Sequence, residues 1–93
     1  MTTITVKGGA IHPPKPIKVI IDNLDNSNDF NYVNPTWFKQ DFNLPPGKYM
    51  IVVSGMNQTN DTTEISIAGN FIANKKRKTK DTWYACVFIG EVK

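Results

Sequence analysis

Five cations crowd into one short part of this 93-residue chain, at Lys75, Lys76, Arg77, Lys78 and Lys80. Side chains of this kind could contact several phosphates of a polyanion, and such binding would fall with salt and ignore base sequence. Single-strand binders also stack bases on aromatic rings, and Trp83 and Tyr84 follow closely in the chain. The alternative, which we favour, is a solvated hairpin tip whose charges prevent edge-to-edge aggregation. Because the net charge of the whole chain is only +3, the remainder is mildly acidic.

Other chemically capable residues do not have the spacing of a catalytic or metal site. His12 is the sole histidine and lies among prolines, whereas a nucleophile pair needs a base held in place by a third group. Asp25, Ser27 and Asp29 alternate like the start of a calcium loop, but the glycine and the closing glutamate of such a loop are missing. Cys86 is the only cysteine, which excludes an internal disulfide and a cysteine metal cage. We therefore expect no enzyme, no metal and no cofactor.

Adjacent aromatic residues give the best indication of a binding surface. Trp37 is followed by Phe38 and Trp83 by Tyr84, and successive side chains of a strand point to opposite faces. One member of each pair should therefore face outward, where aromatic rings mark interfaces or stack on sugars. We predict an interface or ligand-binding surface formed by Trp37, Trp83, Tyr84 and Phe88.

Short alternating segments between polar turns must position these side chains. Residues 2–7 place Ile4 and Val6 on one face and threonines on the other, and residues 17–22 should place Ile17, Val19 and Ile21 inward. The length corresponds to one domain over residues 1–93, and no segment has a convincing helical period. We predict an all-β fold, a single small antiparallel β-sandwich of immunoglobulin-like or jelly-roll-like type with seven to eight short strands. The predicted strands are 2–7, 17–22, 30–33, 36–43, 48–54, 62–68, 70–74 and 82–92.

One turn carries a resemblance to a known class of domain. The run Leu44-Pro-Pro-Gly-Lys-Tyr49 is a tight turn followed at once by a strand that begins with tyrosine. It resembles the tyrosine corner of immunoglobulin-like sandwiches, in which the tyrosine hydroxyl bonds to nearby backbone. The resemblance implies that role for Tyr49 and supports a fold class, but it does not imply a function.

The last predicted strand is apolar on both faces. A face open to water would carry polar residues, as residues 62–68 do with Glu64 and Ser66. So short a chain lacks a third layer to cover a second apolar face. We expect Tyr84 and Phe88 to face outward and to lie at an intermolecular interface. One apolar face is formed by Trp83, Ala85, Val87 and Ile89, and the other by Tyr84, Cys86 and Phe88.

Composition and patterning together favour a binding protein. The chain has no apolar run of signal-peptide or membrane-spanning length, so we expect cytoplasmic synthesis, with incorporation into a virion or surface assembly. We predict a non-enzymatic structural or accessory protein-binding module of a larger assembly of phage or bacterial origin. It would act on a protein partner or as a homo-oligomer. One alternative is a carbohydrate-binding module that uses outward aromatics. Another is a small nucleic-acid-binding or inhibitory protein that uses residues 75–80.

Overall fold

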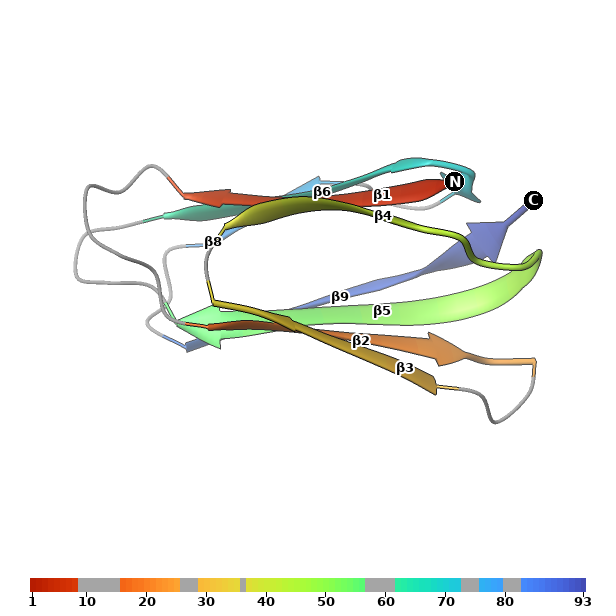
Figure 1. The fold of residues 1–93 in the computed structure, drawn as a ribbon, viewed down its shortest axis with the longest axis horizontal. Helices are drawn as coiled ribbons and strands as arrows, with labels where there is room; N and C mark the ends of the chain where they lie inside the picture. The colour runs from red at the N-terminus through yellow and green to blue at the C-terminus, as the bar shows by residue number, and fades with distance from the viewer. Residues whose placement is uncertain (9–15, 26–28, 36, 57–61, 73–75, 80–82) are drawn as a thin grey trace.

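The computed structural model describes residues 1–8, 16–25, 29–35, 37–56, 62–72, 76–79 and 83–93, and these form two facing antiparallel sheets (Figure 1). The predicted all-β sandwich is confirmed, although the described residues form nine strands rather than seven or eight. The strands are β1 (Thr2–Gly8), β2 (Ile17–Asn23), β3 (Asp29–Asn34), β4 (Phe38–Phe42), β5 (Gly47–Met56), β6 (Thr63–Gly69), β7 (Phe71–Ile72), β8 (Lys76–Thr79) and β9 (Trp83–Val92).

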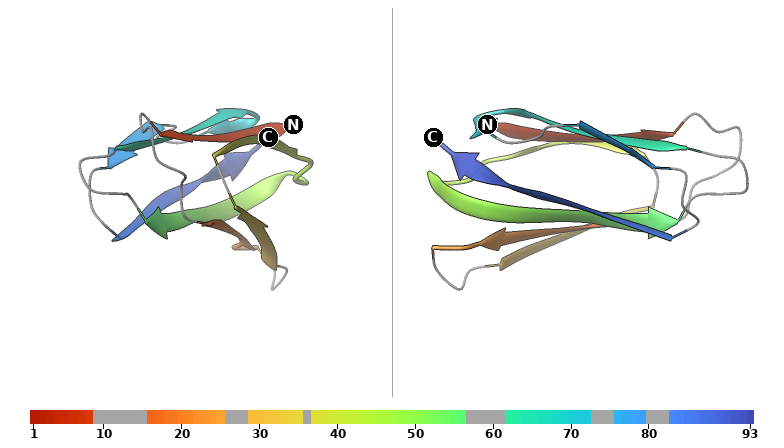
Figure 2. Two further views of the ribbon diagram at one scale, coloured as in Figure 1. Left: turned by 60° about the vertical axis from the view of Figure 1, so that its left-hand side comes forward. Right: turned by 180° about the vertical axis from the view of Figure 1, so that it is seen from behind.

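The two sheets differ in size and in the strands that dominate them. One has four strands in the order β4-β1-β6-β8, and the other has five in the order β3-β2-β5-β9-β7. The longest pairing joins β5 to β9 over ten residues, from Gly47 opposite Val92 to Met56 opposite Trp83. Two further views show the same two layers (Figure 2). The chain changes sheets between β3 and β4, so these edge strands of different sheets are neighbours in sequence.

Apolar side chains from the inner faces of both sheets form one core. Their inward position follows from the period-two alternation of a strand, and the inward sets predicted for residues 2–7, 17–22 and 62–68 are confirmed. The four-stranded sheet contributes Ile4, Val6, Phe42, Ile65 and Ile67, and the five-stranded sheet contributes Ile17, Val19, Ile21, Tyr49, Ile51, Val53, Phe71, Tyr84, Cys86, Phe88 and Val92.

Strand β9 faces the opposite way from our prediction. Phe88 pairs with Ile51 and Cys86 with Val53, and residues directly opposite on neighbouring strands share a face. Because Ile51 and Val53 point into the core, Tyr84, Cys86 and Phe88 point there as well. The prediction that Tyr84 and Phe88 lie outward at an interface is therefore wrong. The outward set of β9 is Trp83, Ala85, Val87 and Ile89.

The predicted tyrosine corner is present. The Tyr49 hydroxyl donates a 2.7 Å hydrogen bond to the Pro45 carbonyl oxygen, four residues back along the chain. The ring is buried, and this burial, followed by the nearby Asp25 carboxylate, raises the pKa of Tyr49. Asp25 also accepts a 3.0 Å hydrogen bond from the backbone N–H of Lys48. The side chains of Tyr49 and Asp25 thus both bond to the backbone of the turn before β5.

The predicted basic loop is in part a strand. Lys76–Thr79 form β8 and pair with β6, from Ser66 opposite Lys76 to Thr63 opposite Thr79. The pairing uses backbone groups, so it does not need the apolar alternation that this segment lacks. Lys75 and Lys80 lie outside the described residues, as does His12.

Candidate functional site

The outer face of the four-stranded sheet, here called the polar face, is covered by hydrophilic side chains. Lys7 forms a 3.4 Å ion pair with Glu64, and the Thr3 hydroxyl donates a 2.6 Å hydrogen bond to Asp41. Among the described residues, the strands of this face carry no large exposed apolar side chain, and the exposed Met1 directly precedes β1. Its outward residues are Thr3, Thr5, Lys7, Lys39, Asp41, Glu64, Ser66, Ala68 and Lys78.

The outer face of the five-stranded sheet, here called the apolar face, has the opposite character. Trp83 is 75% exposed, Ile89 is 65% exposed and Val33 is 61% exposed, and Ile72 and Val87 are also exposed. Such a contiguous apolar surface marks an interaction site more often than it decorates free surface. The outward apolar and small residues are Ile20, Val33, Met50, Val52, Ser54, Met56, Ile72, Trp83, Ala85, Val87 and Ile89, and Lys18, Asp22, Lys48 and Glu91 lie around them.

A shallow hollow of about 390 Å³ interrupts one end of the apolar face. It lies beside the C-terminal part of β9, and Ile89 and Ile72 form apolar parts of its lining. Trp83 begins the same strand at its other end. The apolar face therefore combines an exposed aromatic side chain at one end with a hollow at the other. The hollow is lined by Leu24, Lys48, Ile72, Ile89, Gly90, Glu91 and Lys93.

Two acidic residues lie side by side near the edge of the apolar face. Asp22 of β2 is directly opposite Asp29 of β3. A hydrogen bond between the two side chains raises the pKa of Asp22, and desolvation and the Asp29 charge act in the same direction. Like charges directly opposite on neighbouring strands are destabilising, so this pair would gain from a nearby cation.

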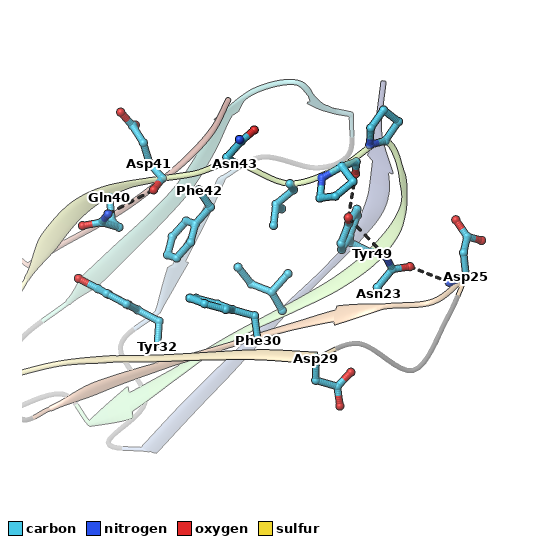
Figure 3. Close-up of a pocket in the computed structure, with 14 residues that line it drawn as sticks. Asn23, Asp25, Asp29, Phe30, Tyr32, Gln40, Asp41, Phe42, Asn43 and Tyr49 are labelled. Carbon is cyan, nitrogen blue, oxygen red and sulfur yellow. Dashed lines mark hydrogen bonds between the residues drawn. The ribbon is translucent and has the colours of Figure 1, made fainter.

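A second hollow, a cleft of about 690 Å³, opens between the edge strands β3 and β4. Figure 3 shows the rings of Phe30, Tyr32 and Phe42 pointing into it from the two sheets. Phe30 and Tyr32 both pack edge-on against Phe42, with ring centroids 5.8 and 5.4 Å apart. Tyr49 and the Leu44-Pro45 turn form its other wall, so the tyrosine corner also shapes this cleft.

Polar side chains surround the cleft at its rim. Figure 3 shows the carboxylates of Asp29 and Asp41 directed away from the rings. The half-exposed ring of Phe30 is the aromatic surface that a ligand would reach first. The polar residues that line the cleft are Asn23, Asp25, Asp29, Gln40, Asp41 and Asn43, and this described lining includes neither lysine nor arginine.

The four aromatic residues predicted as one site are not brought together on one surface. Trp83 is exposed on the apolar face, and Trp37 is partly buried against the core with its indole over Gly8. Phe88 and Tyr84 both lie between the sheets. The pKa of Tyr84 is raised, because the effect of burial exceeds the opposite effect of a hydrogen bond with Thr63. Only Trp83 of the predicted set is fully available to a partner.

The predicted polyanion site is described only in part. Lys78 is exposed on β8 and lies directly opposite Glu64, which also pairs with Lys7. A single-strand binder needs aromatic rings beside its cations. In the described part of the chain Trp83 does not lie beside Lys78, because it faces outward on the other sheet.

Sequence reasoning missed both hollows and most of the apolar face. The signal for the apolar face was available, because Ile20, Met50 and Val52 interrupt the polar side of their strands just as β9 is apolar on both sides. The cleft had no such signal, since Phe30 and Phe42 come from strands of different sheets.

Comparisons with known proteins leave the geometry as the only guide to function. No protein-family model, curated protein or solved structure matches this chain. Within the described residues, no three His, Cys, Asp or Glu side chains are grouped to hold a metal ion. The described segments also contain no helix of the length and apolarity needed to cross a membrane.

Proposed function

We propose that this β-sandwich is a non-enzymatic protein-binding module, a structural or accessory component of a larger assembly, and that the apolar face is its binding surface. One observation carries the proposal, namely the contrast between the two outer faces. Five large apolar side chains are exposed on the strands of one, and the described strands of the other carry none. A sandwich of this size folds around the core between its sheets and gains nothing from apolar residues in water.

The size and layout of the apolar face fit a protein interface. The molecule measures 38 × 20 × 19 Å, so one broad face covers at most roughly 750 Å² in projection, which is of the same order as the ~800 Å² per partner of a standard interface. Apolar residues lie at its centre on β5 and β9, and charged residues such as Lys18 and Glu91 lie towards its margins. An apolar centre with a polar rim is the usual anatomy of a specific interface.

A matched pair of lysine substitutions tests this proposal. Val87→Lys places a charge at the centre of the apolar face, and Ser66→Lys places one on the polar face. Sedimentation velocity should show that Val87→Lys weakens association by about tenfold or more, because a buried unpaired charge is costly, whereas Ser66→Lys leaves association unchanged. If the wild-type chain associates and both variants do so equally well, the apolar face is not the binding surface.

The cleft supports carbohydrate binding as a second candidate function. Its half-exposed Phe30 ring could stack on the apolar face of a sugar, and amides and carboxylates at the rim could bond to hydroxyls. A volume of about 690 Å³ is in the range of small-ligand sites. This candidate uses cleft residues in place of the outward aromatics expected from sequence.

Glycan binding can be separated from protein binding by two alanine variants. In ligand-observed NMR against a panel of oligosaccharides, Phe30→Ala should abolish any binding, because it removes the stacking surface. Trp83→Ala, on the other face, should leave it intact. Binding that depends on Trp83 and not on Phe30 would contradict the assignment of a sugar site to the cleft.

A further inference from the structure

The apolar face has an internal order that indicates what covers it, and this inference rests on the proposed function. Ile20 of β2 is directly opposite Val52 of β5, which is directly opposite Val87 of β9. These three residues form a row across the strands, here called the central row. On each strand, outward positions follow at equal spacing on both sides of this row because side chains repeat every second residue.

The rows that flank the central row are complementary to each other. On one side lie Asp22, Met50 and Ile89, and on the other lie Lys18, Ser54 and Ala85. On β2 an acid corresponds to a base, and on β5 and β9 a large side chain corresponds to a small one. The edge strand β3 does not follow this rule, because Asp29 corresponds there to Val33. A half-turn about the central row would place each flanking row of one copy over the other flanking row of a second copy. Every contact would then occur twice, as in an isologous interface.

The outermost positions of β9 combine an exposed aromatic side chain with a hollow. Trp83 lies four residues before Val87 on β9, and Glu91 lies four residues after it. The same half-turn would bring the exposed Trp83 of one copy over Glu91 and the adjoining hollow of the other. The hollow, at about 390 Å³, leaves room for an indole ring. Tryptophan side chains seated in pockets are frequent anchors of protein interfaces.

We propose that the partner of the apolar face is a second copy of this chain, packed face to face about a two-fold axis that runs along Ile20, Val52 and Val87. Lys18 of each copy lies over Asp22 of the other, and Trp83 of each copy enters the hollow of the other. The two sheets stack with their strands nearly aligned, as in sandwich interiors.

The electrostatics of the edge support this register. Asp22 is paired across strands with Asp29, and a hydrogen bond with that neighbour, desolvation and its charge raise the pKa of Asp22, so the two ionised carboxylates repel each other. Two cations face Asp22 from its own sheet. Lys48 lies one outward position from Met50, the β5 residue opposite Asp22, and Lys18 lies four residues away on β2. In the two-fold arrangement, Lys18 of the second copy supplies a cation to both carboxylates.

Charge reversal at two positions tests the two-fold arrangement. Lys18→Asp and Asp22→Lys should each weaken the dimer by about tenfold or more in sedimentation equilibrium, because each creates two like-charge contacts. An equal mixture of the two variants should form a heterodimer near wild-type strength, since every contact then joins an acid to a base. The double variant Lys18→Asp/Asp22→Lys should recover in the same way. Both side chains point to solvent, and thermal melts check that each variant folds.

Trp83 provides an independent measurement. In a Trp37→Phe background its fluorescence should shift to the blue as protein concentration rises, because the indole leaves water on dimerisation. A wild-type protein that stays monomeric at high concentration overturns the second copy as partner, while the apolar face would remain open to another protein. The two-fold register is wrong if neither charge reversal changes the dissociation constant of the dimer. It is also wrong if the mixture of the two variants does not recover wild-type affinity. A dimer that survives Val87→Lys contradicts the proposed function itself.

Discussion

The two outer faces of this sandwich are built on the same backbone pattern and differ in what their outward positions carry. On β1 and β6 the inward Ile and Val residues alternate with Thr, Ser, Ala or a charged residue. On β5 and β9 the outward positions carry Val, Ile, Met and Trp as well. The polar face shows that the fold itself does not need apolar residues outside its core. The apolar face therefore reflects a requirement beyond folding, which we attribute to association.

The charges on the two faces are arranged differently too. The polar face pairs opposite charges within its own sheet, as Lys7 with Glu64. The apolar face also has one pair of opposite charges, Lys48 opposite Glu91, but at its other edge it carries two acids side by side, Asp22 and Asp29. A sheet face whose charges neutralise each other gains little electrostatic free energy from a partner. A face that leaves like charges adjacent has electrostatic free energy to gain from a partner.

The largest effect expected separates the two faces of β9 itself. Phe88→Ala should lower the free energy of unfolding by about 3–5 kcal/mol, because it leaves a cavity between the sheets. Ile89→Ala, one residue on, should cost about 1 kcal/mol or less, since its side chain is largely in water. Urea denaturation at a concentration where the chain is monomeric measures both. Equal costs would mean that β9 is not oriented as described.

A middle-sized effect is expected at the tyrosine corner, which serves as a reference away from both outer faces. Tyr49→Phe removes the hydrogen bond to Pro45 and should cost about 0.5–1.5 kcal/mol while leaving the fold intact. Self-association should be unchanged at a protein concentration where both proteins are folded. A midpoint of urea denaturation equal to that of the wild type would show that this bond adds nothing to stability.

The smallest effect concerns the acidic pair at the edge of the apolar face. Because the pKa of Asp22 is raised in the folded chain, the native state binds its proton more tightly than the unfolded state does. This group therefore favours folding at low pH, and its contribution is lost as pH rises through the native pKa of Asp22. Asp29→Asn removes the main cause and should flatten that decline in melting temperature.

A comparison between variant and wild type is needed for this pH measurement because other carboxyls act in the opposite direction. Glu91 bonds to Lys93 at 2.9 Å, and this bond lowers the pKa of Glu91, so that its contribution is lost as pH falls. Subtracting the Asp29→Asn profile from the wild-type profile, over about pH 3 to 6, isolates the Asp22 contribution. Identical profiles would show that the pair is not coupled in solution.

Sequence reasoning succeeded where one face of a segment was apolar and the other polar. It predicted the sandwich, the inward residues of β1, β2 and β6, and the role of Tyr49, because period-two alternation and turn chemistry are local. It failed on β9, since with apolar residues on both faces alternation cannot say which face is inward. It also failed on β8. This strand forms by backbone pairing with β6, and its side chains do not alternate between apolar and polar, so the sequence pattern does not predict it.

The candidate sites were harder to predict because both depend on contacts between distant segments. The central row joins Ile20, Val52 and Val87, and its existence depends on the register of three strands. The cleft joins Phe30 to Phe42 and Tyr49 across two sheets. Register and sheet assignment are tertiary properties, so a single sequence identified Trp83 but not the surface around it.

The most direct test of the central claim is a map of which face is covered when the chain associates. Methyl and amide NMR spectra recorded across a dilution series would report this residue by residue. We predict concentration-dependent shifts at Ile20, Val52, Val87 and Ile89, and unchanged signals at Thr3, Thr5 and Ser66 on the polar face. Shifts confined to the polar face or to the cleft residues Phe30 and Phe42 would contradict the account.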